Sequence, residues 1–130
     1  MSQMSGVGLM IGQTHHFRQD APEKIDYAIN RYTNETKRVY SVMYEQLPTS
    51  KFIACKQYSI ADVAIFPRLR NWENHGIVWG DYPHLKAWVN LVGARPAVQR
   101  GVKVLADLHR SSTSDREREI FFGKTQYENR

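Results

Sequence analysis

The sequence predicts an all-α protein, a bundle of about five helices joined by short loops. Two observations carry this prediction. Apolar residues recur at steps of three and four along most of the chain, and prolines or capping residues stand where these runs begin and end. No run shows the period-two alternation of a half-buried strand, and no internal repeat is present. A helical bundle around a single core satisfies all of these features.

Composition indicates a folded domain in a reducing compartment. The 130 residues suit one domain, and 42% hydrophobic with 24% charged residues is ordinary for a globular protein. The single cysteine, Cys55, excludes an internal disulfide. The first residues do not form a signal peptide, and no run is apolar for long enough to span a membrane. We therefore expect a cytoplasmic protein with no membrane partner.

The net charge of +5 raises the question of nucleic-acid binding. Lys and Arg are spread along the chain and mixed with Asp and Glu, and no dense basic run or RNA-recognition motif occurs. Solvated helix faces account for this charge, so we expect no nucleic-acid partner.

The chain divides into an N-terminal segment and linker (1–20), a helical domain (21–110) and a tail (111–130). Residues 1–11 are rich in Gly, Met and Ser, and Gly12–Asp20 is predicted to be a short polar link. In the tail, residues 111–115 are polar, and Ile120 to Gly123 is predicted to be a small apolar anchor.

A long helix is predicted from about Ala21 to Leu47. Asp20 can cap it and Glu23 can close a capping box, while Pro22 suits the first turn. Pro48 ends the helix. Its apolar stripe comprises Ile25, Ile29, Tyr32, Thr36, Val39, Met43 and Leu47.

A second helix is predicted to start at Ser59, which forms an S-x-x-D capping box with Asp62. The run 60–66 is apolar nearly all round, which favours a position in the centre of the bundle. Pro67 lies inside the pattern and predicts a kink.

Two further helices come after a turn region. Asp81 is predicted to cap the first, with Pro83 in its first turn. The second restarts near Pro96. The apolar positions are Leu85, Trp88, Val89 and Val92 in the first helix, and Val98, Val102, Leu105 and Leu108 in the second.

Three strings, in order, resemble a known family. Tyr58 to Pro67 (YSIADVAIFP) resembles the capped core helix of glutathione transferases. Tyr82-Pro83-His84-Leu85-x-x-Trp88 and then Ala94 to Val98 (ARPAV) resemble the segments that come after that helix in the same family. The resemblance implies the carboxy-terminal helical domain of that family, whose usual thioredoxin-like first domain has no counterpart in this sequence. It also implies that the segment 1–20 is a remnant of the family's first helix with its linker.

The amino-terminal half is similar to the bacterial Nu-class branch. The matching stretches are Gly12 to Phe17 and Ala21 to Arg38, with Phe121-Phe122-Gly123 in the tail. Members of this branch often act as glutathione-dependent disulfide-bond reductases. The sequence departs from the family at Ala54-Cys55-Lys56, where a glycine is usual, and at Arg68, where an aromatic residue is common.

A polar stripe on the long helix is the candidate ligand site. Tyr27, Arg31, Asn34 and Arg38 are spaced by four, three and four residues, so they share one face. Two guanidiniums beside an amide and a phenol suit a carboxylate, and glutathione carries two. The resemblance implies that Arg31 reaches glutathione across the cleft between domains. The alternative is a solvated helix face with an Arg31–Glu35 pair.

The resemblance also places the segment with His16 and Phe17 beside the cleft, so both are candidate cleft-lining residues together with Tyr27, Asn34 and Arg38. Ser59 and Asp62 are assigned to the capping box, and no catalytic residue is assigned. Two adjacent histidines cannot face the same way, and no metal-ligand spacing accompanies them, so no metal is expected.

Two classes of function remain open. The chain is either the helical half of a glutathione S-transferase or disulfide-bond reductase, or a non-catalytic interaction scaffold or truncated remnant. The expected ligand is glutathione. The expected partner is a second copy or a separate thioredoxin-like domain, because apolar surface that the missing domain normally covers would promote association.

Overall fold

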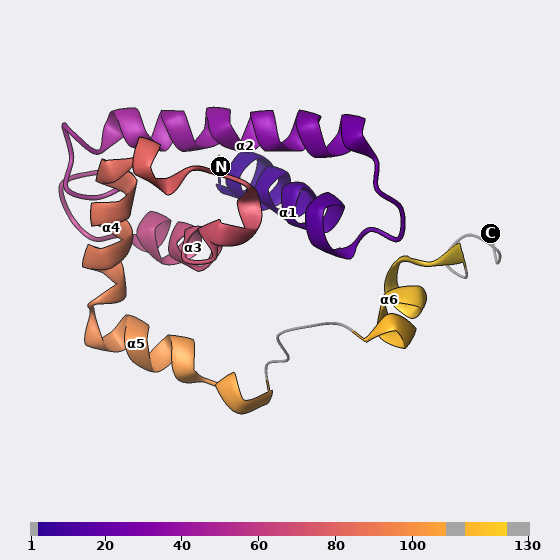
Figure 1. Ribbon diagram of the computed structural model, residues 1–130. Helices are drawn as coiled ribbons and strands as arrows, with labels where there is room; N and C mark the ends of the chain where they lie inside the picture. Colours follow the sequence, from indigo (N-terminus) through magenta and orange to yellow (C-terminus); the bar gives the residue numbers. More distant parts are fainter. Residues whose placement is uncertain (1–2, 109–113, 125–130) are drawn as a thin grey trace.

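The computed structural model describes residues 3–108 and 114–124 (Figure 1). These residues form six α-helices and no strand, which confirms the predicted all-α class; the sixth helix lies in the tail. The helices are α1 (Leu9–His15), α2 (Asp26–Gln46), α3 (Ile60–Leu69), α4 (Pro83–Gly93), α5 (Pro96–Lys103) and α6 (Asp115–Phe122).

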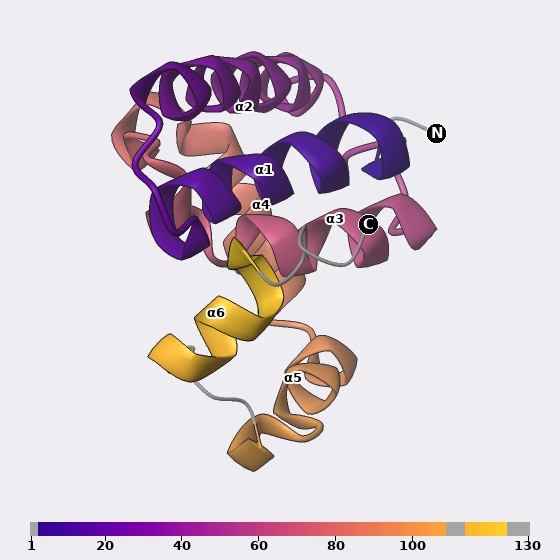
Figure 2. The same cartoon turned by 90° about the vertical axis from the view of Figure 1, so that its right-hand side faces the viewer.

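The first helix occupies the middle of the bundle. A π-helical turn, Gln3–Gly8, leads into α1, and the two together lie between α2 and α3, with α1 packed on α2 and the turn packed on α3 (Figure 2). Val7 and Ile11 enter the core beside residues of α2, α3 and α4, including Val39, Leu69 and Trp88. This core crosses the predicted domain boundary at residue 21, so we propose that the folding unit includes α1.

Two buried threonines bring α1 and α2 close together. The Thr14 hydroxyl lies 2.7 Å from the Thr36 hydroxyl and 2.8 Å from the carbonyl oxygen of Tyr32. Both threonines are 0% exposed. Small side chains let two helix backbones approach, and mutual hydrogen bonds satisfy the hydroxyls that this approach buries.

The long helix begins later than the sequence predicts. The predicted link Gly12–Asp20 is helical: α1 runs to His15 and a π-helix continues over His16–Asp20. Ala21, which precedes a proline, is extended (φ −57°, ψ 135°), so the helical path breaks there. The helix α2 therefore starts at Asp26, and the predicted Asp20–Glu23 capping box does not form.

The buried face of α2 follows the predicted stripe from Thr36 onward, whereas Ile25, which precedes the helix, is 44% exposed. Thr36, Val39 and Met43 are buried, and Tyr40 joins them at 0% exposed. Its hydroxyl lies 2.8 Å from Nδ1 of His75, which is 3% exposed and sits in a short 3-10 helix, Trp72–His75.

The helix α3 carries the predicted capping box. Ile65, Phe66 and Leu69 are buried, whereas Ile60 is 87% and Val63 54% exposed. The prediction that this helix is covered on all sides is therefore wrong for its first turn, because one flank has no neighbouring helix in the described part of the chain.

The ends of the next two helices also differ from the prediction. Tyr82, rather than Asp81, occupies the N-cap of α4, and Pro83 is its first residue. The helix α5 ends at Lys103, and Leu105 has a positive φ of 55°. The predicted continuation through Leu105 and Leu108 is wrong, since both side chains are exposed.

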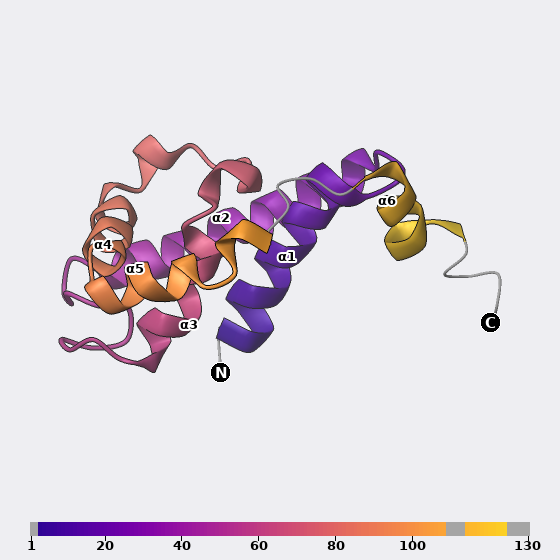
Figure 3. The same ribbon diagram turned by 90° about the horizontal axis from the view of Figure 1, so that it is seen from below.

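The tail helix lies at the far end of α1 and α2 from α4 and α5 (Figure 3). Phe122 contacts the ring of His16, with centroids 4.8 Å apart, and Arg118 Nη2 donates to the Gln19 carbonyl oxygen at 3.3 Å. Of the predicted anchor, Phe122 is half-buried, whereas Ile120 and Phe121 are exposed. Residues 111–113 of the predicted polar stretch lie outside the described residues.

Candidate functional site

A groove runs along the exposed face of α2. Its volume is about 730 Å³, and Met10 of α1 forms part of its wall. Because the four polar residues predicted from the sequence recur every three or four positions, they line this groove together. The lining comprises Met10, Tyr27, Asn30, Arg31, Tyr32, Asn34, Glu35 and Arg38.

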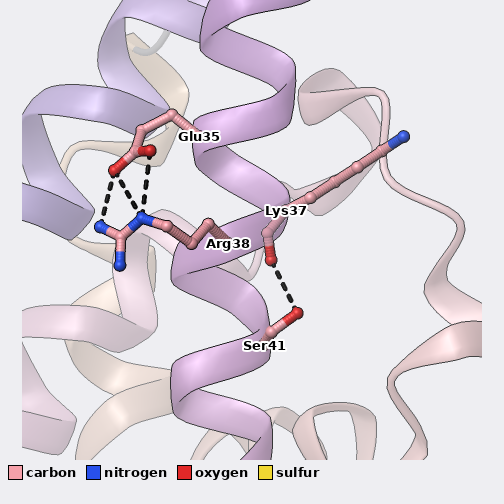
Figure 4. Close-up of polar contacts among 4 residues, drawn as sticks. All are labelled: Glu35, Lys37, Arg38 and Ser41. Atoms are coloured by element: carbon pink, nitrogen blue, oxygen red, sulfur yellow. Dashed lines mark hydrogen bonds and ion pairs between the residues drawn. The ribbon is translucent and has the colours of Figure 1, made fainter.

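One of the two arginines in the groove is already engaged. Arg38 Nη2 donates to Glu35 Oε1 at 2.6 Å, and Arg38 Nε donates to Oε1 at 3.0 Å and to Oε2 at 3.1 Å (Figure 4). This hydrogen-bonded ion pair, called the Glu35–Arg38 fork below, lowers the pKa of the Glu35 carboxyl and raises the pKa of the Arg38 guanidinium. The charge of Arg31 also lowers the pKa of Glu35, as a smaller contribution.

The other arginine is available. Within residues 3–108 and 114–124, Arg31 forms no ion pair or hydrogen bond through its guanidinium, although it is exposed and borders Glu35 in the groove. The pair predicted for a plain solvated face, Arg31 with Glu35, is therefore replaced by a pair between Glu35 and Arg38. Five unused donors in a planar fork suit a carboxylate.

The two aromatic candidates from the linker lie elsewhere. His16 and Phe17 border a second hollow, between the segment 16–25 and the tail helix. Phe17 stacks on Tyr32, with centroids 5.4 Å apart and the planes within 6°. Since Tyr32 also lines the groove on α2, Phe17 supports that wall from behind, while His16 packs against Phe122.

Four residues of the lining lie outside the predicted polar stripe: Met10, Asn30, Tyr32 (which was assigned to the apolar stripe) and Glu35. Asn30 and Glu35 lie one position away from the predicted stripe, so the width of a helix face was the signal that could have found them. Met10 had no such signal, because α1 was not expected to lie along α2.

The capping box of α3 is a structural site. Asp62 is 0% exposed and accepts hydrogen bonds from Ser59 N and Ser59 Oγ, at 2.9 and 3.2 Å. Its other oxygen accepts from Trp88 Nε1 at 2.9 Å and from Ile53 N at 3.1 Å. Both oxygens of this carboxylate accept hydrogen bonds from the protein, which accounts for Asp62 through its structural role.

The remaining candidate chemistry is sparse. Among the described residues, no group of three or more His, Cys, Asp or Glu side chains could hold a metal ion. Cys55 is exposed and lies 3.1 Å from the carbonyl oxygen of Gln57. No helix in the described ranges combines the length and hydrophobicity that a membrane crossing requires.

The chain is an all-α bundle with a polar groove on α2, and comparison with known proteins places it in a family. The family of glutathione S-transferase C-terminal domains matches residues 7–96. The chain belongs to this family.

Two relatives from Escherichia coli (strain K12) are similar in sequence. Disulfide-bond oxidoreductase YfcG is 42% identical over 95 residues, and disulfide-bond oxidoreductase YghU is 45% identical over 93 residues. These matches cover 73% and 66% of this chain but 44% and 32% of the relatives. The chain thus spans less than half the length of either protein.

Solved structures of glutathione complexes have the same fold. Ure2p in complex with glutathione superposes with a TM-score of 0.72 at 29% identity, over 78% of this chain and 50% of that one. A glutathione transferase from Burkholderia graminis, with two glutathione molecules bound per subunit, gives 0.71 at 36% identity, over 78% and 45%.

Proposed function

We propose that this chain is the helical half of a glutathione-binding transferase or disulfide-bond reductase, and that Arg31 binds a carboxylate of glutathione. The single observation that carries the proposal is the groove on α2, where Arg31 offers an unengaged guanidinium between Tyr27 and Asn34. The glutathione bound in the similar structures and the names of the E. coli relatives support the choice of ligand.

The donor set fits glutathione chemically. A carboxylate can take two parallel hydrogen bonds from a guanidinium, and such charge-assisted pairs are the strong ones. Tyr27 and Asn34 add a hydroxyl and an amide on the same helix face. Arg38 adds positive potential, but its Nε and Nη2 groups already donate to Glu35.

Turnover is not assigned to this chain alone. None of the described side chains in the groove is a nucleophile next to a base, the arrangement that covalent catalysis needs. We propose that a thioredoxin-like domain outside the given sequence completes the cleft and supplies the catalytic group. The cytoplasmic location expected from the sequence stays a prediction.

The test is a calorimetric titration with reduced and with oxidised glutathione, using the wild-type chain, Arg31→Ala and Lys37→Ala. Lys37 is the matched control: it is an exposed cation on α2, but its side chain extends away from the Glu35–Arg38 pair and does not line the groove (Figure 4). We expect Arg31→Ala to weaken binding by about tenfold or more, because a hydrogen-bonded charge contributes about 1.5–3 kcal/mol. Lys37→Ala should bind as the wild type does.

Equal weakening by both variants would mean that only overall charge attracts the ligand. No binding at millimolar glutathione would refute the proposal for the isolated chain. That result would favour the alternative function, a non-catalytic interaction scaffold.

An interaction role has support of its own. Large apolar side chains are exposed on several elements, including Val42 of α2 at 58%, Val63 of α3 at 54% and Val104 after α5 at 69%. Such surface promotes association. We propose that the chain forms a dimer or a larger species, which light scattering over a dilution series would test.

A further inference from the structure

Glu35 is the one carboxylate in a groove that otherwise attracts anions. It is flanked on α2 by Arg31 four residues before it and Arg38 three residues after it. It accepts hydrogen bonds from Arg38 through both carboxylate oxygens and none from Arg31.

The fork does not use the whole carboxylate. Oε1 accepts two hydrogen bonds from Arg38, at 2.6 and 3.0 Å, whereas Oε2 accepts one, at 3.1 Å. An ionised carboxylate has about four acceptor sites. Because the Glu35 side chain is still 32% exposed, Oε2 can accept a further hydrogen bond from a donor that enters the groove.

The groove therefore presents two opposite charges side by side. Arg31 and Glu35 are one helical turn apart, the spacing at which side chains on one face are neighbours. Arg31 can hold an anionic group while Glu35 accepts from a cationic one, and neither has to break an existing ion pair. A ligand that matches this pair carries an ammonium and a carboxylate close together.

We propose that Glu35 makes this groove selective for the α-amino-acid end of its ligand, the γ-glutamyl end in the case of glutathione. The ligand carboxylate lies on Arg31 and the ligand ammonium donates to Glu35 Oε2. This inference rests on the proposed binding of glutathione at Arg31, and it adds which end of the ligand faces α2.

The fork with Arg38 has a second effect on selectivity. With Glu35 ionised, the three side chains carry a net single positive charge, and Arg38 is turned toward an internal carboxylate. A ligand with carboxylates alone would meet the free guanidinium of Arg31, an Arg38 already paired with Glu35, and the repelling carboxylate of Glu35. Glu35→Gln would remove the repulsion and release Arg38, so ligands without an ammonium should then bind as well as those with one.

The experiment compares glutathione with glutaryl-cysteinyl-glycine, which keeps both carboxylates and the thiol and lacks only the amino group. Each is titrated by two-dimensional NMR into the full wild-type chain, Glu35→Gln and Glu45→Gln. Glu45 is the control, because it is exposed on α2 outside the groove. An amide spectrum that matches that of the wild-type chain away from the substituted residue is the check that each variant is folded.

We expect the wild-type chain and Glu45→Gln to prefer glutathione by about fivefold, the upper range for a partly exposed ion pair. Glu35→Gln should lose the preference, mainly by binding the analogue more tightly. Equal binding of both ligands by the wild-type chain, or a preference that survives in Glu35→Gln, would overturn the inference and leave glutathione binding standing. No shift with either ligand would overturn both.

Discussion

The helices α3 and α6 begin with capping boxes of the same kind, but Asp62 in the box of α3 is buried and the box of α6 is exposed. In each, a serine hydroxyl and a carboxylate three residues later bond to each other's backbone. Asp62 accepts from Ser59 N at 2.9 Å, and Glu117 accepts from Ser114 N at 2.9 Å. Local geometry alone does not distinguish the two.

The difference lies in the second carboxylate oxygen. In α3, Oδ1 of Asp62 accepts from Ile53 N and Trp88 Nε1, which ties the loop before α3 and the middle of α4 to one buried atom. In α6, the three hydrogen bonds of the box are exposed. The same motif thus ties buried elements of the bundle together in α3, whereas its hydrogen bonds in α6 are exposed at the start of the helix.

The largest expected effect comes from Asp62→Ala. It removes the acceptor for two distant donors, Ile53 N and Trp88 Nε1, and each buried donor left unpaired costs about 1–3 kcal/mol. With the lost cap, we expect the free energy of unfolding to fall by about 3 kcal/mol or more. Urea unfolding followed by circular dichroism measures this.

The control for that variant is Ser59→Ala, which removes the cap but keeps the carboxylate and its distant donors. It should cost about 1 kcal/mol. If Asp62→Ala lowered the free energy of unfolding no more than Ser59→Ala, the capping box of α3 would stabilise only its own helix, as the capping box of α6 does.

Lowering the pH should also destabilise the core, where His75 is buried, rather than the tail helix. Burial, with smaller contributions from His15 and Arg68, lowers the pKa of His75 to about 4 from its ordinary value of 6.5. Between these values the unfolded chain binds the proton and the folded chain does not, so stability falls as the pH falls. The loss reaches about 3 kcal/mol near pH 4.

The measurement is urea unfolding between pH 7 and pH 4, for the wild-type chain and for His75→Gln, whose amide oxygen can still accept from Tyr40. The variant should show a shallower decline over this range. Parallel curves would mean that other groups, such as the paired Glu35, cause the acid sensitivity.

The smallest expected effect is that of Ser114→Ala in the tail. The exposed box should contribute about 0.5–1 kcal/mol to α6 and nothing to the bundle. Amide exchange in residues 115–122 should quicken, while the urea midpoint of the protein stays the same. A lower midpoint would show that the contact between Phe122 and His16 couples the tail to the core.

Sequence reasoning succeeded where the interaction was local. The S-x-x-D pattern at Ser59 identified the box of α3, and the spacing from Tyr27 to Arg38 identified one wall of the groove, because residues of one helix have a fixed geometry. The distant hydrogen-bond partners of Asp62 could not be predicted from residue spacing. Trp88 lies 26 positions away and meets it only through the packing of α4 on α3.

The same pattern misled at Asp20. The residues Asp20 and Glu23 have the spacing of a capping box, as do Ser59 with Asp62 and Ser114 with Glu117, yet only the last two boxes form. A capping box needs an extended residue at the cap, and Asp20 is instead the last residue of a π-helix. The capping box of Ser114 and Glu117 also has this spacing in the sequence, but it was overlooked because the residues around it are mostly polar.

The central position of α1 has a consequence for biosynthesis. Ile11 leaves the ribosome before the core residues of α2, α3 and α4, and the last residue of α3, Leu69, emerges 58 residues later. At about 5–20 residues per second, the apolar side of α1 waits on the order of 3 to 12 s for that surface. During this interval the nascent chain offers a chaperone a target that the finished bundle hides.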